Sequence, residues 1–129
     1  MKQVKGCLLS MVLWLCSSVI SVHAQDTRQN SIEAMTVAQQ GNVVNVKMTF
    51  KTPLSELPSG FSVAKPARIA LDFPNVENGL GSASQIYNEG ALKSANIIQA
   101  DGRTRVVLNL NQAMTYETAI EGNALVLSL

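Results

Sequence analysis

Strict alternation of apolar and polar side chains is the sequence feature that most constrains the fold of this chain. It is clearest in residues 67–73, where the apolar side chains at every second position are Ile69, Leu71 and Phe73. Successive side chains of a strand point to opposite sides, so this period of two is typical of a β-strand with one buried and one exposed face. Pro74 and Asn75 are expected to end the strand, because proline donates no hydrogen bond to a sheet and asparagine favours turns.

The same signals recur along the chain and predict a fold made almost wholly of strands. Alternation or short apolar runs predict further strands over residues 31–38, 42–51, 61–64, 91–100, 103–110, 116–120 and 124–129. Turn-forming residues at Gly41, Asp101–Gly102 and Gly122 separate three pairs of them, which predicts hairpins. About seven or eight short strands with frequent turns are typical of an all-β sandwich.

One irregular segment and one longer pattern complete the expected fold. Residues 76–90 lack a clear period, and we expect one short helix near residues 82–84, between the two halves. The halves resemble each other, because each has a hairpin around a glycine turn, then a strand led by an aromatic residue and a final strand. This echo predicts a small sandwich of two pseudo-symmetric antiparallel sheets, although any meander of strands can show such echoes.

The first 24 residues have the three parts of a secretory signal peptide. A basic start with Lys2 and Lys5 precedes an apolar stretch over residues 8–20, and Val22-His23-Ala24 is typical of a cleavage site. A membrane anchor is the alternative, but a span needs about 20 apolar residues and serines interrupt this stretch. We therefore expect a signal peptide over residues 1–24, a flexible leader over 25–30 and one domain over 31–129.

Composition excludes several functions for the expected mature chain. Cys7, Cys16 and His23 all lie in the expected signal peptide, so no cysteine or histidine remains for a zinc site, a catalytic triad or a cysteine nucleophile. Without Lys2 and Lys5, the ten basic residues become eight against nine acidic ones, a net charge of −1 that predicts no nucleic-acid partner. The carboxylates left for glycoside hydrolysis are scattered: Asp72, Glu77, Glu89 and Asp101. We expect no enzyme, no metal and no cofactor.

Polar residues on the outward faces of two strands are the candidate ligand-binding residues. An arginine can hold planar acceptors through its guanidinium and can stack on a sugar ring, and an aspartate can accept hydrogen bonds from hydroxyls. Together these groups suit a polymer that carries hydroxyls and carboxylates, such as peptidoglycan. The candidates are Arg103, Arg105, Arg68, Asp72, Asn109 and, as a stacking platform for a sugar ring, Tyr87.

A structural role is the alternative for the same residues. Arg68 and Asp72 lie on one face of a strand and could pair with neighbours across the sheet, and Arg105 could do the same. Tyr87 could close the core with its ring and hydrogen-bond outward. Aromatic residues make up only 5% of the chain. This favours a shallow polar surface over the exposed aromatic residues that carbohydrate-binding modules usually carry.

Two motifs carry a resemblance to a known family. Residues 65–75, Lys-Pro-Ala-Arg-Ile-Ala-Leu-Asp-Phe-Pro-Asn, resemble the proline- and arginine-containing core motif of AMIN domains. Residues 102–110, Gly-Arg-Thr-Arg-Val-Val-Leu-Asn-Leu, match the second signature of that family, an arginine-led strand after a glycine turn, and residues 116–125 fit its last hairpin. The resemblance extends from about Ser31 to Leu129. It is strongest to the AMIN domains at the N-terminus of type IV pilus secretins.

The resemblance implies a non-catalytic sandwich in the periplasm that binds peptidoglycan. Full-length secretins are associated with the outer membrane, so the domain would anchor such a ring to the cell wall in pilus biogenesis and protein secretion. Secretin subunits and other pilus proteins are then the expected protein partners. No secretin barrel sequence is present, so we expect the front fragment of a longer protein. A docking module for another periplasmic pilus protein and the targeting domain of a cell-wall amidase are the alternatives.

Overall fold

The computed structural model describes residues 29–129, and these residues form ten β-strands and no helix. The strands are β1 (Asn30–Gln40), β2 (Val43–Phe50), β3 (Ser59–Ala64), β4 (Ala67–Pro74), β5 (Val76–Asn78), β6 (Ser84–Glu89), β7 (Leu92–Ala100), β8 (Arg103–Leu110), β9 (Glu117–Glu121) and β10 (Ala124–Ser128). The expected signal peptide and residues 25–28 of the expected leader lie outside the described residues. Within the described part, no helix is long and apolar enough to cross a membrane.

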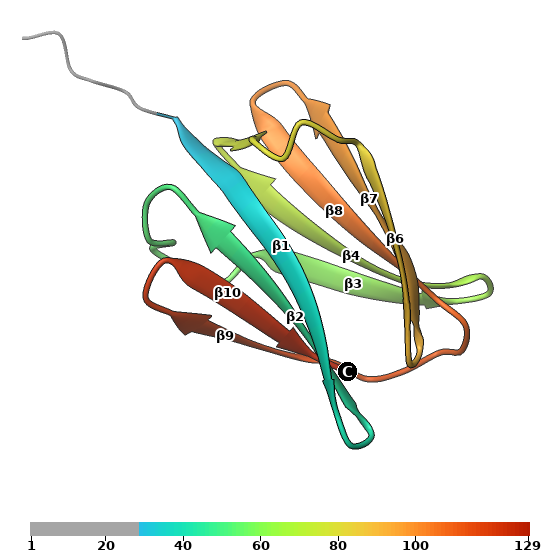
Figure 1. The fold of residues 1–129 in the computed structure, drawn as a ribbon. Coiled ribbons are helices and arrows are strands. Elements are labelled where there is room, and N and C mark those ends of the chain that lie inside the picture. The colour runs from blue at the N-terminus through green and yellow to red at the C-terminus, as the bar shows by residue number, and fades with distance from the viewer. Residues whose placement is uncertain (1–28) are drawn as a thin grey trace, which may run out of the picture.

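Two five-stranded sheets pack face to face (Figure 1). Sheet A has the strand order β5-β1-β2-β10-β9, and sheet B has the order β3-β4-β8-β7-β6. Neighbouring strands are antiparallel except β5, which runs parallel to β1. The predicted all-β sandwich is therefore confirmed. One detail is corrected: sheet A is mixed, because the chain leaves sheet B after β4 and lays β5 beside β1.

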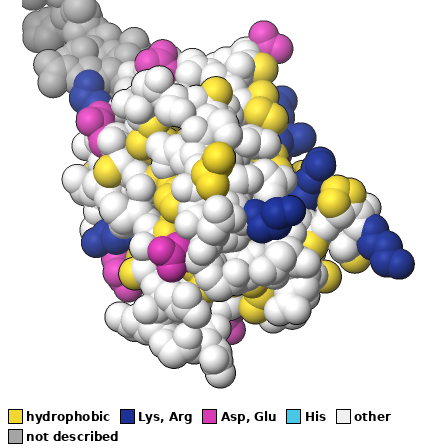
Figure 2. Space-filling view, turned by 45° about the vertical axis from the view of Figure 1, so that its right-hand side comes forward, with side chains coloured by type: hydrophobic (Ala, Val, Ile, Leu, Met, Phe, Trp, Pro, Cys, Tyr) yellow, Lys and Arg dark blue, Asp and Glu magenta, His cyan; other side chains and the backbone are white. Residues whose placement is uncertain are grey.

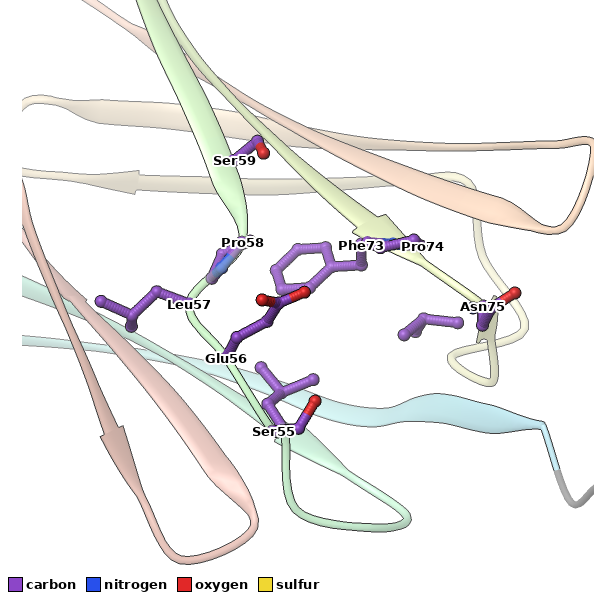
Figure 3. A pocket seen from close by; sticks show the side chains of 10 residues that line it. Ser55, Glu56, Leu57, Pro58, Ser59, Phe73, Pro74 and Asn75 are labelled. Carbon is purple, nitrogen blue, oxygen red and sulfur yellow. The ribbon is translucent and has the colours of Figure 1, made fainter.

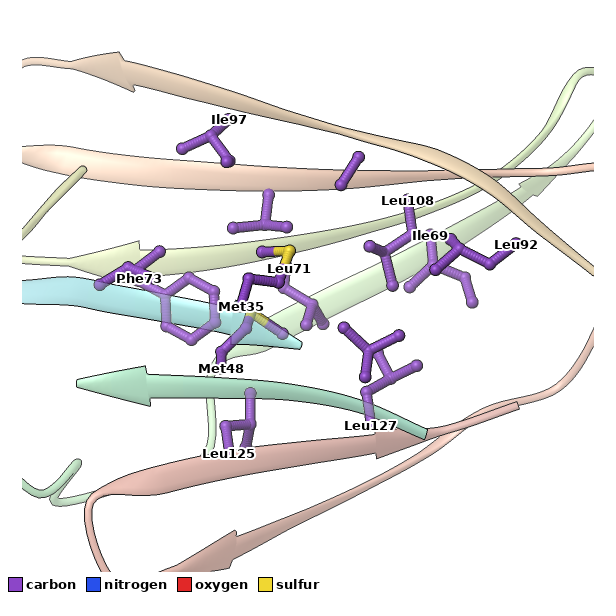
Figure 4. Packing of buried hydrophobic residues seen from close by; sticks show 14 of the residues in the cluster. Met35, Met48, Ile69, Leu71, Phe73, Leu92, Ile97, Leu108, Leu125 and Leu127 are labelled. Atoms are coloured by element: carbon purple, nitrogen blue, oxygen red, sulfur yellow. The ribbon is translucent and has the colours of Figure 1, made fainter. Parts of the chain in front are cut away.

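The apolar faces of the alternating strands meet between the two sheets (Figure 4). The predicted inward residues are buried there: Val44, Val46, Met48, Phe50, Ile69, Leu71, Phe73, Val106, Leu108, Leu110, Leu125 and Leu127. The ring centroids of Phe50 in sheet A and Phe73 in sheet B are 5.3 Å apart. Each fully buried side chain of this size stabilises the fold by about 1.5–3 kcal/mol relative to its exposed state. This core holds the two sheets together and leaves their outer faces for other uses.

The internal repeat predicted from the sequence appears in the topology, but the two halves of the chain exchange hairpins between the sheets. One half has the hairpins β1-β2 and β3-β4, and the other has β7-β8 and β9-β10. However, β2 pairs with β10, and β4 pairs with β8. Each sheet therefore joins the first hairpin of one half to the second hairpin of the other. The registers correspond too: Met48 faces Leu125 in sheet A as Leu108 faces Ile69 in sheet B.

Tight turns and one buried hydroxyl fix where the central strands begin. Gly41 and Gly102 have positive φ values of 61° and 74°, which glycine adopts without a steric penalty. They close the β1-β2 and β7-β8 hairpins, as the sequence predicted. At the start of β8, the buried hydroxyl of Thr104 donates a hydrogen bond of 2.5 Å to the carbonyl of Val76. This bond ties β5, a strand of sheet A, to sheet B.

Residues 76–90 contain two strands that the sequence did not predict, β5 and β6. The predicted short helix near residues 82–84 is wrong. Asn78 organises this segment instead: its side-chain nitrogen donates to the carbonyl of Ser82 at 2.9 Å, and its side-chain oxygen accepts from the amide of Leu80 at 3.0 Å. The hydroxyl of Ser82 then donates to the carbonyl of Ser84. Such local hydrogen bonds from side chains to the backbone compete with the hydrogen bonds of a helix. The chain continues from them into β6.

Candidate functional site

The predicted arginines lie on β4 and β8, which are neighbours at the centre of sheet B. Their registered pairs are Arg68 with Asn109, Ala70 with Val107, Asp72 with Arg105 and Pro74 with Arg103. The alternate residues of both strands point into the core, so these pairs lie on the opposite side of the sheet. The fold therefore brings five of the six predicted binding residues together on the outer face of sheet B: Arg68, Asp72, Arg103, Arg105 and Asn109.

Strands β3 and β7 extend the outer face of sheet B on either side of β4 and β8. The register gives three rows across it: Val63-Arg68-Asn109-Ser94, Phe61-Ala70-Val107-Asn96 and Ser59-Asp72-Arg105-Ile98. Neighbouring rows are two residues apart along each strand, or about 6–7 Å. The outer face of sheet B is thus one continuous surface on which charged, neutral and apolar side chains alternate at short range.

Asp72 and Arg105 form a two-point ion pair on this face. Arg105 donates from Nε to one carboxylate oxygen at 2.7 Å and from a terminal nitrogen to the other at 2.9 Å. The hydrogen bond from Arg105 is the main cause that holds the pKa of Asp72 below its ordinary value of 3.8; burial opposes the shift, and the charges of Arg105 and Arg103 add to it. The two residues therefore pair across the sheet, which was one of the two roles expected for them.

Arg105 also covers the aromatic ring of Phe61, which the sequence did not identify as part of this surface. Its guanidinium carbon lies 5.5 Å from the ring centroid of Phe61 in β3, within the range of a cation–π contact. Phe61 is 49% exposed, and Ile98 in β7 is 53% exposed. They lie on opposite sides of the β4-β8 pair. Period alone could not identify them as surface residues. All six residues of β3 are exposed, so burial imposes no alternation on Phe61, and Ile98 directly follows another apolar residue, Ile97, that is buried.

A shallow hollow of about 210 Å³ lies between these apolar side chains. Its lining residues are Phe61, Val63, Arg68, Ala70, Ile98, Arg105 and Val107. The cross-strand pair of Ala70 and Val107 forms the floor, and both side chains are small. Arg68 also borders a second hollow of about 140 Å³, beside Leu110 and Met114. Within residues 29–129 the ion pair of Asp72 with Arg105 is the one present, so Arg68 is not paired there.

The other two predicted residues of β8 lie near its ends. Asn109 donates a hydrogen bond of 3.0 Å to the hydroxyl of Ser94 in β7. Arg103 is exposed beside the β7-β8 turn, where it lines a hollow of about 320 Å³ with Ile98, Ala100, Asp101 and Arg105. It forms no ion pair within the described residues. Among residues 29–129, Arg68 and Arg103 are therefore the arginines of the outer face of sheet B that have no ion-pair partner.

Tyr87 is the predicted binding residue that the fold sets apart from the others. It lies in β6, where Ile86 is 78% exposed but Tyr87 packs against the hydrophobic core. Its hydroxyl donates a hydrogen bond to the side-chain oxygen of Gln85, and burial raises its pKa above the ordinary value of 10.0. The ring thus helps to close the core, which was the alternative role expected for it.

Comparison with known proteins identifies the family to which this chain belongs. The profile of the AMIN domain matches residues 39–129. The chain belongs to the AMIN domain family. The chain is similar to the fimbrial assembly protein PilQ of Pseudomonas aeruginosa, with 39% identity over 88 residues. It is also similar to the type IV pilus biogenesis and competence proteins PilQ of Neisseria gonorrhoeae and Neisseria meningitidis, with 31% identity over 103 residues.

The family expectation from the two motifs is therefore confirmed. The matches to PilQ cover 68–70% of this chain. They cover only 12–14% of those proteins, so this AMIN domain spans a small part of the length of the relatives that it matches.

The outer face of sheet A gives the AMIN domain a different surface. Two of its central pairs join small or neutral side chains, Ala124 with Thr49 and Ser128 with Asn45, and the hydroxyl of Ser128 donates to the side-chain oxygen of Asn45 at 2.7 Å. This pair occupies the position that Asp72 and Arg105 hold in sheet B. Lys47 is the charged residue of β2 on this face. In the space-filling view, several Lys and Arg side chains lie next to hydrophobic ones on the right-hand side, where Figure 1 places sheet B (Figure 2).

A further hollow of the AMIN domain lies away from the predicted residues. It has a volume of about 250 Å³ and lies between the loop over residues 54–59 and residues 73–76 (Figure 3). Phe73 contributes an apolar side, and Glu56 contributes the one carboxylate. Among the described residues, no group of three or more His, Cys, Asp or Glu side chains could hold a metal ion. The outer face of sheet B remains the place where the predicted residues converge.

Proposed function

We propose that this AMIN domain is a non-catalytic module that binds peptidoglycan in the periplasm. It anchors an outer-membrane secretin similar to PilQ to the cell wall during type IV pilus biogenesis. Membership of the AMIN family and the similarity to PilQ proteins support this proposal. The observation that carries it is the outer face of sheet B. There Arg68 and Arg103, which form no ion pair within the described part of the chain, lie beside the exposed Phe61 and Ile98.

The chemistry of this face suits a large, flat polymer better than a small molecule. Its hollows are shallow, and its arginines project from central strands that the core and the Asp72–Arg105 pair keep rigid. A guanidinium binds carboxylates in a planar, two-point geometry. Peptidoglycan is an extended polymer layer in which carboxylates and apolar groups recur. Weak contacts at several arginines can therefore add up through multivalency.

Sedimentation with isolated sacculi tests the proposal. Residues 25–129 contain the whole core and are the protein to use. We expect the domain to pellet with sacculi at low salt and to be released as salt screens the arginines. Arg68→Ala and Arg103→Ala should each weaken apparent binding about 3–10-fold, the loss expected when one exposed hydrogen bond worth about 0.7–1.4 kcal/mol is removed. Arg105→Ala is less informative, because it would also leave Asp72 without its partner.

Lys47→Ala is the matched control, because it removes one exposed positive charge from the outer face of sheet A. It should leave pelleting unchanged, and circular dichroism should show that all variants are folded. A domain that stays in the supernatant at low salt contradicts the proposal. Equal losses for Lys47→Ala and Arg103→Ala would mean that binding follows net charge rather than this face.

Protein docking is the second candidate function, and the exposed edge of sheet B favours it. All six residues of β3 are exposed, and one side of this strand has no neighbour among the described strands. Such an edge can accept a strand from another protein. This function predicts a stable complex with a periplasmic pilus component in pull-downs and no affinity for sacculi. Targeting of a cell-wall amidase would use the same wall-binding face, but the similarity to PilQ favours the pilus.

A further inference from the structure

Most polar groups on the outer face of sheet B are already bonded to one another. Both carboxylate oxygens of Asp72 accept hydrogen bonds from Arg105. Asn109 donates to Ser94, and the side-chain oxygen of Asn96 accepts from a serine of β6 at 3.3 Å. A glycan strand is recognised chiefly through hydroxyls, which need free donors and acceptors of this kind. These bonds occupy part of the hydrogen-bonding capacity that the face could offer to a sugar.

Aromatic stacking adds little for a sugar ring on this face. Phe61 is the aromatic residue that the described strands place there, and the guanidinium of Arg105 lies over its ring. Tyr87, the platform expected from the sequence, packs against the core instead. The two usual modes of glycan recognition, hydroxyl hydrogen bonds and an open aromatic platform, are thus both weak here.

What stays free is one guanidinium beside an apolar floor. Arg68 borders the hollow of about 210 Å³ and is not paired within the described residues. The floor of that hollow is Ala70 and Val107, and Ile98 forms its far wall. A guanidinium selects a carboxylate, and a floor of small aliphatic side chains accepts methyl groups. No Asp or Glu side chain lines this hollow or the second one beside Arg68.

We infer that this face binds the peptide stems of peptidoglycan rather than its glycan strands. A free stem carboxylate sits on Arg68, and the methyl side chains of neighbouring alanines lie over Ala70 and Val107. This inference rests on the proposed wall-binding function and names the part of the polymer that is recognised. It makes binding depend on how many stems have free carboxylates, whereas glycan recognition would not.

The test is a competition assay, because a muramoyl-alanine amidase that removes the stems also removes the cross-links that let a sacculus sediment. Released stem peptides should prevent residues 25–129 from pelleting with intact sacculi, whereas the same amount of stem-free glycan strands should not. In solution, a stem peptide ending in D-alanine should shift the NMR amide signals of Ala70 and Val107. N-acetylglucosamine oligomers at the same concentration should not.

Two substitutions locate the site within the domain. Arg68→Gln keeps the side-chain length but removes the charge, and should weaken stem-peptide binding about tenfold, the loss expected for a charge-assisted contact. Ala70→Leu should have a similar effect, because it fills the hollow without changing the charge. Lys47→Gln is the control for charge, and thermal unfolding checks that each variant is folded.

The outcomes separate the inference from the function on which it rests. Failure to bind intact sacculi overturns the proposed function. Equal competition by stem peptides and by stem-free glycan strands, or shifts of the same amides by the sugar oligomers, overturns only the inference. Stem-dependent binding that survives both Arg68→Gln and Ala70→Leu also overturns it, because the peptide would then bind elsewhere. Stem-dependent binding lost in both variants supports it.

Discussion

The ion pair between Asp72 and Arg105 gives the domain a pH dependence whose direction follows from its geometry. Arg105 bonds the charged carboxylate, so the folded-state pKa of Asp72 lies below the ordinary value of 3.8. A carboxyl group with a lowered folded-state pKa contributes stability that is fully present above its unfolded pKa. That contribution disappears as the pH falls through the lower, folded-state value. The pair is partly exposed, so the effect is screened by solvent and modest.

Asp72→Asn should therefore lower the free energy of unfolding at neutral pH and lose this effect in acid. Urea unfolding of the wild type and the variant, from about pH 7 to about pH 2, measures the difference. We expect a constant gap above pH 3.8 that closes below it. Glu117→Gln, which also removes one exposed negative charge, is the control. A gap that persists at the acid end would show that the carboxylate stabilises the fold by other means.

Among the elements, β5 is the shortest strand, and the chain changes sheet both before and after it. It runs parallel to β1, and the next residue, Gly79, lies very close to that strand. A Cβ atom at Gly79 would lie 2.6 Å from the carbonyl oxygen of Ile32. This contact is with backbone, which cannot rotate away as a side chain could. The glycine therefore permits the close approach that places β5 against sheet A.

Gly79→Ala should destabilise the domain by about 1–3 kcal/mol, the usual cost of forcing extra atoms into a packed site. The expected structural effect is separation of β5 from β1, which amide hydrogen exchange would detect as faster exchange over residues 76–78. Glu77→Ala is the control, because Glu77 is an exposed residue of the same strand. A melting temperature equal to that of the wild type would contradict the role given to Gly79.

The elements also show how far the sequence could predict this fold. Strands with one apolar face, such as β2, β4, β8 and β10, were predicted because burial imposes a period of two. β6 was missed because it is an outer strand whose residues are mostly exposed, so burial imposes little pattern on it. The helix expected near residues 82–84 failed because the side chains of Asn78 and Ser82 bond the backbone there.

The candidate site was predictable only in part. Alternation placed Arg68, Asp72 and Arg105 on outward faces, and this is where they lie. Strands that are neighbours in a sheet come from distant parts of the chain, and the local alternation of apolar and polar residues does not predict this pairing. The sequence alone therefore could not predict the ion pair between Asp72 and Arg105. The contribution of Phe61 was missed because all six residues of β3 are exposed, so burial imposes no alternation on that strand.

At the scale of the whole molecule, the exchanged hairpins make each half of the chain dependent on the other. Sheet A needs β10 from the second half beside β2, and sheet B needs β4 from the first half beside β8. Each half therefore supplies one central neighbouring strand to the sheet that holds the first hairpin of the other. An isolated hairpin is marginally stable at best, so neither half has a way to bury its apolar faces alone.

Fragments over residues 25–80 and 81–129 should each be unfolded when made separately. Mixed or co-expressed, they should assemble into the complete sandwich, because every strand then finds its neighbours. NMR spectra of each fragment and of the mixture provide the measurement: poor dispersion alone and the spectrum of the intact domain together. A dispersed spectrum from either fragment by itself would refute this interdependence.

The strand order of sheet A also has a mechanical consequence. Strands β1 and β10 flank β2, and both run antiparallel to it, so Asn30 and Ser128 lie at opposite ends of the same sheet (Figure 1). Tension applied between these two ends pulls β1 and β10 in opposite directions along β2. The hydrogen bonds that join β1 and β10 to β2 are then loaded together in shear, instead of breaking one after another. Sheet B lies outside this path, so its strands carry little of the load.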